Sequence, residues 1–238
     1  KNNEFNLIGI AKGSGMIAPN MATMLAYIFT DLNISSTILQ KVLISENEKT
    51  FNSITVDSDT STSDTVLLLS TNQKRNKRVT QVSDPLFKRF KYCLNETMMN
   101  LAKQIVKDGE GAEKIIEIKV INAVSNRAAK NIAMSIANSP LVKTAIAGED
   151  ANWGRIIMAI GKTNEKIELN KIKIFFGNEL VTNRGMRYKN YSETKVSEYL
   201  KNKEISISID LGIGEKNWSV FTCDLTEKYV HINADYRS

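Results

Sequence analysis

The stretch KGSGMIAPNMATMLAYIFTD, residues 12–31, joins a glycine-rich turn to an unbroken apolar run. Flexible glycines and a fixed proline packed so closely indicate a backbone that must take a special shape. The apolar run over residues 23–30 is short and rich in β-forming residues, which predicts a strand covered on both faces. A single threonine, Thr23, therefore lies between the turn and the predicted buried strand, at the start of that strand.

Short strand and helix patterns alternate on either side of this stretch. Residues 4–11 predict a strand before the turn, and residues 65–71 predict another strand of the buried type. Ser35 or Ser36 is placed to cap a helix. The longest helix is expected to open near Pro85, since apolar residues then recur every three or four positions.

The second half of the chain continues the alternation in shorter blocks. This alternation of strands and helices, without repeats or a low-complexity linker, predicts an α/β or α+β fold in which helices cover the sheets. The patterns predict helices over 126–138, 153–162 and 192–202, and strands over 114–124, 141–148, 166–176, 204–211, 218–225 and 228–234.

Composition narrows the function classes. The 238 residues are 42% apolar and 24% charged, as in an ordinary globular protein. The net charge of +6 comes from scattered lysines rather than a concentrated stripe, so nucleic-acid binding is not expected. No apolar stretch is long enough for a membrane span, so we expect a cytoplasmic location. Cys93 and Cys223 are far apart in sequence, and His231 is the single histidine, within a predicted strand. These counts give no support to a disulfide framework and exclude a multi-histidine metal site. The carboxylate-rich segment 55–64 is interpreted as a hydrogen-bonded turn rather than a metal site.

Thr23 is a candidate nucleophile. A hydroxyl needs an adjacent base, and the chain offers no persuasive histidine, but a threonine at a new N-terminus can use its own α-amine. The pKa of an α-amine is about 7.7–8, which leaves a useful neutral fraction near pH 7. Small Ala22 leaves room for attack on the preceding peptide bond. The alternative at this point is an ordinary threonine at the start of a strand.

Five blocks of sequence stand out along the chain: GIAKGSGMIAPNMATMLAYIFTD (9–31), TFNSITVDSDTSTSDTVLLL (50–69), LAKQIVKDGEGAEK (101–114), AGEDANWGRI (147–156) and INADYRS (232–238). Together these blocks resemble one known family, the glutamate N-acetyltransferase / ornithine acetyltransferase family of arginine biosynthesis. The resemblance implies a layered sheet-and-helix sandwich of the ornithine acetyltransferase and DmpA type, similar to the N-terminal-nucleophile fold.

The resemblance also implies a reaction. Such a precursor cuts itself between Ala22 and Thr23, which leaves an α chain and a β chain whose first residue is Thr23. Thr23 then takes acetyl from N2-acetyl-L-ornithine as an ester and passes it to L-glutamate. The family uses no metal and no resident cofactor, and some members also accept acetyl-CoA as donor.

Four further residues match the substrate contacts of the family. Lys12 in the glycine turn would meet a substrate carboxylate, and Glu110 in the DGEGA turn would meet the ornithine amine. Asn233 and Ser238 match two contacts near the C-terminus of the family's chains. Read without the resemblance, these residues are a loop lysine, a carboxylate in a turn that ends a helix, and two residues of a frayed tail.

The resemblance implies a missing half as well. The family's N-terminal half supplies an oxyanion hole, and here only residues 1–22 correspond to its end, followed by the β-chain region 23–238. We therefore expect the C-terminal portion of an acetyltransferase that works as an αβ hetero-oligomer. Two alternatives stay open: an N-terminal-threonine amidase or aminopeptidase, and a truncated domain without activity.

Overall fold

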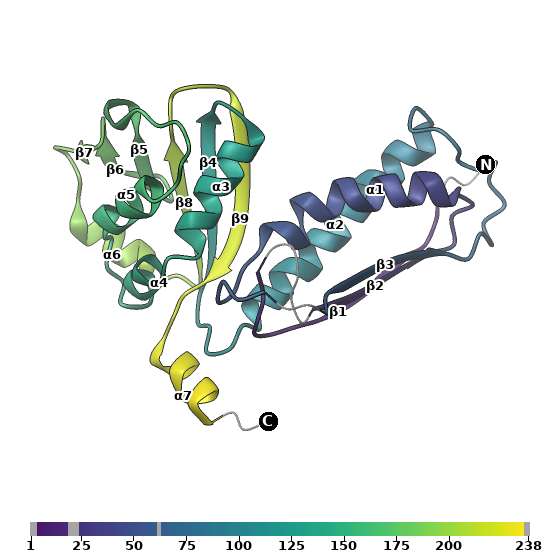
Figure 1. The fold of residues 1–238 in the computed structure, drawn as a ribbon, viewed down its shortest axis with the longest axis horizontal. Helices are drawn as coiled ribbons and strands as arrows, with labels where there is room; N and C mark the ends of the chain where they lie inside the picture. The colour runs from purple at the N-terminus through teal and green to yellow at the C-terminus, as the bar shows by residue number, and fades with distance from the viewer. Residues whose placement is uncertain (1–3, 19–23, 61–62, 236–238) are drawn as a thin grey trace. The chain divides into compact units, whose positions relative to one another are not determined.

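The computed structural model describes residues 4–18, 24–60 and 63–235. Its contacts divide the chain into two compact units, Lys1–Ile54 with Asp59–Ile105 and Thr55–Ser58 with Val106–Ser238. Each unit combines a sheet with helices, as Figure 1 shows, which confirms the predicted mixed α and β class. Within the described residues, no helix is both long and apolar enough to cross a membrane.

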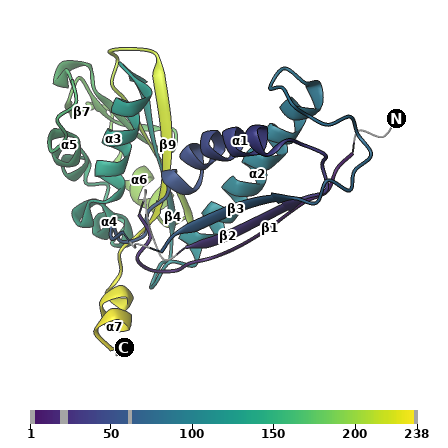
Figure 2. The same ribbon diagram turned by 45° about the vertical axis from the view of Figure 1, so that its right-hand side comes forward.

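The first unit is a three-stranded sheet with helices on one face. Strand β2 lies in the centre, antiparallel to β1 and parallel to β3. Helices α1 and α2 cover the same face of this sheet (Figure 2). The elements are β1 (Leu7–Lys12), β2 (Leu25–Thr30), α1 (Ser36–Lys49), a 3₁₀ turn (Phe51–Ser53), β3 (Thr65–Ser70) and α2 (Pro85–Lys107).

Local signals explain both helices. The Ser35 side chain accepts a hydrogen bond from the Ile38 amide at the start of α1, as predicted for a serine cap. Helix α2 begins at Pro85, as predicted, and its buried stripe includes Phe90, Leu94 and Met98. Gly9 lets β1 approach α2 closely, since a Cβ there would lie 2.7 Å from the Leu101 side chain.

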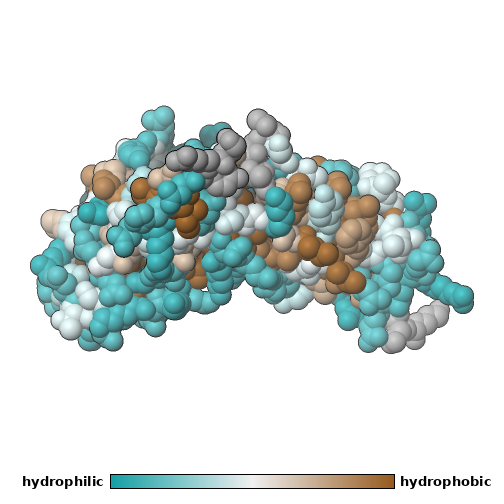
Figure 3. Space-filling model, turned by 90° about the horizontal axis from the view of Figure 1, so that it is seen from below, coloured by the Kyte–Doolittle hydropathy of each residue, from teal (hydrophilic) through white to brown (hydrophobic). Residues whose placement is uncertain are grey.

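The opposite face of the same sheet is open in the described residues. The strand register aligns alternate side chains of the three strands on this face. Exposed apolar residues on it are Ile8, Ile10, Phe29, Leu67 and Leu69. The apolar run predicts a strand covered on both faces, and in this chain the sheet has one covered face and one open face. Figure 3 views the molecule from below and shows hydrophobic side chains gathered there.

The second unit contains a six-stranded mixed sheet. The strand order is β7-β6-β5-β8-β4-β9, with β4 and β8 parallel in the middle. Apolar residues alternate along β4 and β8, and one face packs on a core shared with α3, α4, α5 and α6. The elements are β4 (Ile115–Ala123), α3 (Asn126–Ala137), α4 (Pro140–Ala147), α5 (Trp153–Gly161), a 3₁₀ turn (Leu169–Lys171), β5 (Lys173–Phe176), β6 (Glu179–Asn183), β7 (Met186–Arg187), α6 (Glu193–Leu200), β8 (Glu204–Asp210), β9 (Lys216–Cys223) and α7 (Glu227–Asp235).

Three predicted strands of this unit differ from the structure. Residues 141–148 lie almost entirely in helix α4, because Ser139 caps it and Pro140 fits its first position. Residues 166–176 form a 3₁₀ turn before the short strand β5. The prediction of a strand at 228–234 is wrong, since these residues form helix α7 and His231 is exposed on it.

Candidate functional site

Glu110 and Asn233 are brought together in the second unit. Glu110 lies in the turn that follows α2, and Asn233 lies on α7 near the end of the chain. The Nδ2 group of Asn233 donates a hydrogen bond of 2.8 Å to Oε2 of Glu110 and another, of 3.0 Å, to the Tyr229 carbonyl. Two of the residues predicted to bind substrate thus present a carboxylate and an amide side by side.

Helix α7 is held by the turn rather than by a core, since none of its residues is buried. Gly111 has φ +71°, and a Cβ there would lie 2.6 Å from the Tyr229 nitrogen, so the helix rests directly on the glycine. The Thr226 hydroxyl donates to the Gly111 carbonyl at 2.7 Å. This close approach places Asn233 within reach of Glu110.

An ion pair adds to the attachment of α7. Nζ of Lys228 lies 2.6 Å from Oε1 of Glu113. The bond to Lys228 lowers the pKa of Glu113, and the same bond raises the pKa of Lys228. Both groups are exposed, so the pair contributes little free energy, and its effect is to orient the helix.

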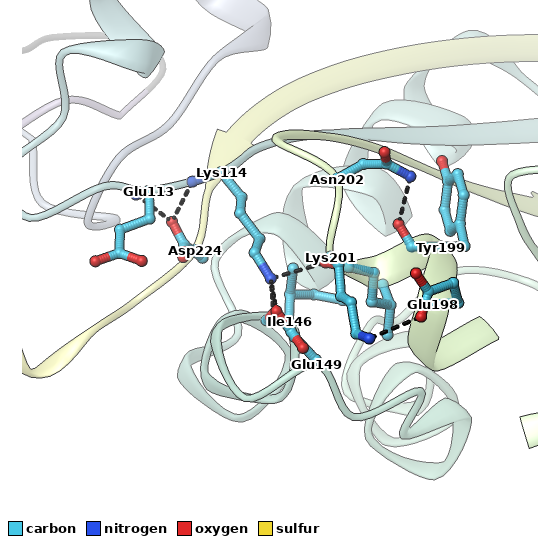
Figure 4. Close-up of polar contacts among 10 residues, drawn as sticks. Glu113, Lys114, Ile146, Glu149, Glu198, Tyr199, Lys201, Asn202 and Asp224 are labelled. Carbon is cyan, nitrogen blue, oxygen red and sulfur yellow. Dashed lines mark hydrogen bonds and ion pairs between the residues drawn. The ribbon is translucent and has the colours of Figure 1, made fainter. Parts of the chain in front are cut away.

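The end of the same turn is fixed to the sheet, as Figure 4 shows. Oδ1 of buried Asp224 accepts hydrogen bonds of 2.9 Å from the amides of Glu113 and Lys114. Nζ of Lys114 donates to the Leu200 carbonyl at 2.7 Å and pairs with Glu149 at 3.2 Å. The residues after Glu110 are therefore rigidly placed.

A buried lysine stabilises the same unit. The Lys143 side chain is 3% exposed, and its ammonium donates to the Val56 carbonyl at 2.7 Å, to the Thr222 hydroxyl at 2.8 Å and to the Cys223 carbonyl. Burial lowers the pKa of Lys143, and burial raises the pKa of the Cys223 thiol. The three N–H donors of the Lys143 ammonium thus have three oxygen acceptors, so protein groups replace the water that a lysine would otherwise bind.

In the first unit, Lys12 ends β1 and is exposed. It pairs with Leu25 across the antiparallel ladder, so the two side chains share the open face of the sheet. The glycine turn then passes through Met16, whose φ of 54° is rare for a residue with a side chain. This strained position agrees with the special backbone shape predicted for the turn.

Met24 is fixed on both sides in the same unit. Its amide donates a hydrogen bond of 2.6 Å to Oδ1 of Asp64, and its carbonyl accepts one of 3.0 Å from the Thr65 amide. Partial burial raises the pKa of Asp64, and the bond from Met24 opposes this shift. Asp64 directly precedes β3, just as Met24 directly precedes β2.

Some predicted residues cannot be placed. The nucleophile Thr23, the preceding Ala22 and the contact Ser238 lie outside the described residues. Lys12 is placed in one unit, and Glu110 and Asn233 are placed together in the other.

Sequence reasoning missed Asp64 and Gly111. The available signals were a carboxylate directly before a strand and a glycine in the helix-ending turn DGEGA.

The carboxylate-rich segment contains local turn structure. The Thr55 hydroxyl accepts from the Ser58 amide, and Ser58 has φ 69°. Among the residues that the structure describes, no group of three or more histidine, cysteine, aspartate or glutamate side chains is arranged to hold a metal ion.

The sequence is similar to a set of curated proteins. It is 53% identical over 232 residues to the "Arginine biosynthesis bifunctional protein ArgJ" of Zymomonas mobilis, covering 98% of this chain and 57% of that protein. The protein of the same name from Mesorhizobium japonicum is 51% identical over 97% of this chain and 56% of its own length. The chain thus spans little more than half the length of these relatives.

A solved structure and a family model agree with this similarity. The crystal structure of arginine biosynthesis bifunctional protein argJ from Bacillus halodurans superposes with a TM-score of 0.85 at 40% identity. The match covers 90% of this chain and 100% of that one, and it confirms the predicted fold class. The model of the ArgJ family matches residues 1–238. The chain therefore belongs to the ArgJ family.

Proposed function

We propose that this chain is the catalytic portion of an enzyme that moves acetyl from N2-acetyl-L-ornithine to L-glutamate. The observation that carries the proposal is the match of the ArgJ family model to the whole chain. The hydrogen bond between Glu110 and Asn233, two predicted substrate contacts, supports it. The names of the relatives include arginine biosynthesis, and a role in that pathway would place this protein in the cytoplasm.

The reaction proceeds in two ester-level steps at Thr23. The hydroxyl oxygen bonds to the acetyl carbonyl carbon, its proton passes to the Thr23 α-amine, and the carbonyl electron pair moves to oxygen. When the electron pair returns, the bond to the ornithine α-nitrogen breaks, and the ammonium proton leaves with that nitrogen. Glutamate then reverses the sequence and removes acetyl from Thr23. One pocket serves both amino acids because they bind in turn.

The substrate contacts have separate roles in this proposal. The Lys12 ammonium binds the substrate α-carboxylate, and the Glu110 carboxylate binds the side-chain ammonium of ornithine. Asn233 donates to Glu110 and holds that carboxylate in place. Ser238 supplies a further polar contact to the substrate.

Self-cleavage between Ala22 and Thr23 creates the α-amine. The resemblance of residues 9–31 to the cleavage junction of the family's precursor supports this step.

The proposed partner is the α chain, the N-terminal half of the same precursor. The match leaves 43% of the Zymomonas mobilis relative without a counterpart, since 57% of it is covered. The exposed apolar residues of β1, β2 and β3 offer a face for that half to cover. This half would also supply the oxyanion hole, and loss of one such donor typically slows catalysis by about 10²–10³.

The word "bifunctional" in the names of the relatives supports a second donor. Acetyl-CoA would enter the same cycle by esterifying Thr23, after which glutamate accepts the acetyl group. The cycle needs no metal and no resident cofactor.

The experiment uses the full-length gene product with N-acetylornithine, in the presence and absence of glutamate. Release of ornithine that depends on glutamate, together with a Thr23 peptide heavier by one acetyl group, supports transfer. Release without glutamate would indicate an amidase, and no release would indicate an inactive domain. The Thr23→Ala variant should neither cleave nor transfer, and normal cleavage of this variant by intact mass would refute the mechanism.

A further inference from the structure

Asp224 directly follows β9 and anchors the turn that carries Glu110. Its Oδ1 atom accepts hydrogen bonds of 2.9 Å from the amides of Glu113 and Lys114, as Figure 4 shows. The Asp224 amide donates to the Lys114 carbonyl at 3.2 Å. One residue thus makes three hydrogen bonds to the end of the turn, three and four positions after Glu110.

The burial of this carboxylate is costly. Asp224 is 3% exposed, and among the described residues its other oxygen, Oδ2, is buried without a hydrogen-bond partner. A buried carboxylate loses its hydration, and here the two turn amides are the hydrogen-bond donors that replace the water. A buried charge is weak evidence for stability, but its bonds can select one backbone conformation over others. The conformation selected here is that of the turn after Glu110.

The same chain segment continues into α7, which carries Asn233. Two residues after Asp224, the Thr226 hydroxyl donates to the Gly111 carbonyl at 2.7 Å, and α7 begins at the next residue. The Asn233 side chain then reaches Oε2 of Glu110 at 2.8 Å. Asp224 therefore links the two predicted substrate contacts. Its side chain holds the turn of Glu110, and its backbone leads into the helix of Asn233.

We propose that Asp224 is a positioning residue for substrate binding, which sets the Glu110 carboxylate relative to Asn233. The inference rests on the proposed function, in which Glu110 binds the side-chain ammonium of ornithine. Asp224 is buried, so it acts through the turn amides rather than by touching substrate. Without its bonds the turn gains other conformations, and a smaller fraction of molecules holds Glu110 in the binding position. The apparent affinity for N-acetylornithine then falls by the same factor.

The test compares Asp224→Asn and Asp224→Ala in the full-length gene product. Asparagine keeps an oxygen for both turn amides, whereas alanine removes the acceptor. For Asp224→Ala we expect KM for N-acetylornithine to rise about 10-fold or more, and KM for glutamate to stay within about threefold. For Asp224→Asn both KM values should stay within about threefold of the wild type. KM does not depend on the amount of active enzyme, so loss of folded protein alone does not change it.

Asp210→Ala is the matched control. Oδ1 of Asp210 also accepts two hydrogen bonds, from the Gly212 amide and the Asn122 side chain, and it lies at the other end of the same sheet. This variant should leave both KM values unchanged. If Asp224→Ala fails to fold, Asp224→Leu, which fills the space but has no acceptor, should show the same rise in KM.

Three results would overturn the inference: an unchanged KM for N-acetylornithine without the acceptor, an equal rise for glutamate, or an equal rise in Asp224→Asn. Each of them leaves the proposed function intact, because the wild type still transfers acetyl. A wild type that transfers no acetyl overturns the proposed function, and this inference then fails with it.

Discussion

The Glu110 carboxylate accepts a hydrogen bond from Asn233 across a separation of 123 residues. The bond joins a turn at the end of α2 to a helix at the end of the chain. Neither residue is buried, so hydrophobic packing does not explain the contact. A carboxylate that is fixed by an amide and still accessible can bind a cationic substrate group.

Glu110→Gln should separate the two substrates. The amide keeps an oxygen for Asn233 but loses the charge that we propose binds the ornithine side-chain ammonium. A hydrogen bond to a charged group contributes about 1.5–3 kcal/mol, so KM for N-acetylornithine should rise about 10- to 100-fold. KM for glutamate, which has no such ammonium, should stay within about threefold. Steady-state kinetics with each substrate varied in turn decides, and equal changes in both values would contradict the assignment.

Gly111→Ala should impair the site without removing any functional side chain. The added Cβ would lie 2.6 Å from the Tyr229 nitrogen, and φ +71° is unfavourable for alanine, so α7 must move away from the turn. The Asn233 contact is then lost, and kcat/KM for N-acetylornithine should fall to the level of Asn233→Ala. Gly161→Ala is the matched control, since its added Cβ would have no atom within 4 Å beyond its two chain neighbours and the backbone of its own helix. Normal activity of Gly111→Ala would show that the docking of α7 on Gly111 is not needed to position Asn233.

Much of the first unit and the central strands of the second could be predicted from sequence. The serine cap before α1, the proline at the start of α2 and the alternation along β8 are local signals, and the structure follows them. Helix α7 was missed because its β-branched residues favour a strand, whereas its docking on Gly111 is a tertiary contact. The open face next to β2 does not follow from the apolar run alone, because such a run predicts burial without showing what covers each face.

The candidate site divides in the same way. Lys12, Glu110 and Asn233 could be predicted as site residues because their motifs resemble those of a known family. Asp64 was accessible only in part, since a segment rich in hydroxyls and carboxylates predicts hydrogen-bonded turns without saying which carboxylate holds which amide. The structure supplies that information: the register aligns Leu25 with Thr65, and the Met24 amide before one strand donates to the Asp64 carboxylate before the other.

The open sheet face should be needed for assembly with the α chain that we propose as partner. Leu67→Lys places a charge among exposed apolar residues of β1, β2 and β3 and should prevent the α chain from co-purifying with this chain. Ile44→Lys on α1 is the matched control, since Ile44 is 62% exposed and lies on a helix that covers the other face. Size-exclusion chromatography of the full-length gene product after cleavage measures the effect. Equal retention of the α chain by both variants would argue against this face as the interface.

Lys143→Met should destabilise the second unit at neutral pH. The substitution keeps most of the apolar stem but leaves the Val56 and Cys223 carbonyls without the ammonium, while the Thr222 hydroxyl keeps its bond to the Ala137 carbonyl. Each unpaired carbonyl costs about 1–3 kcal/mol, so the loss should be about 2 kcal/mol or more. Denaturant unfolding measures it, with exposed Lys162→Met as the control. A loss below about 1 kcal/mol would show that the ammonium gains no more than it costs to bury.

The same lysine predicts a pH dependence of stability. Burial lowers the pKa of Lys143 below the 10.5 of an exposed lysine, so between the two values the unfolded chain binds more protons than the folded one. The free energy of unfolding contributed by this group therefore rises with pH through that window and is constant above it. In Lys143→Met this rise should be absent, so the difference between the wild type and the variant should increase as pH approaches 10.5. Unfolding curves at several pH values test the sign, and a difference that shrinks with pH would contradict a lowered pKa.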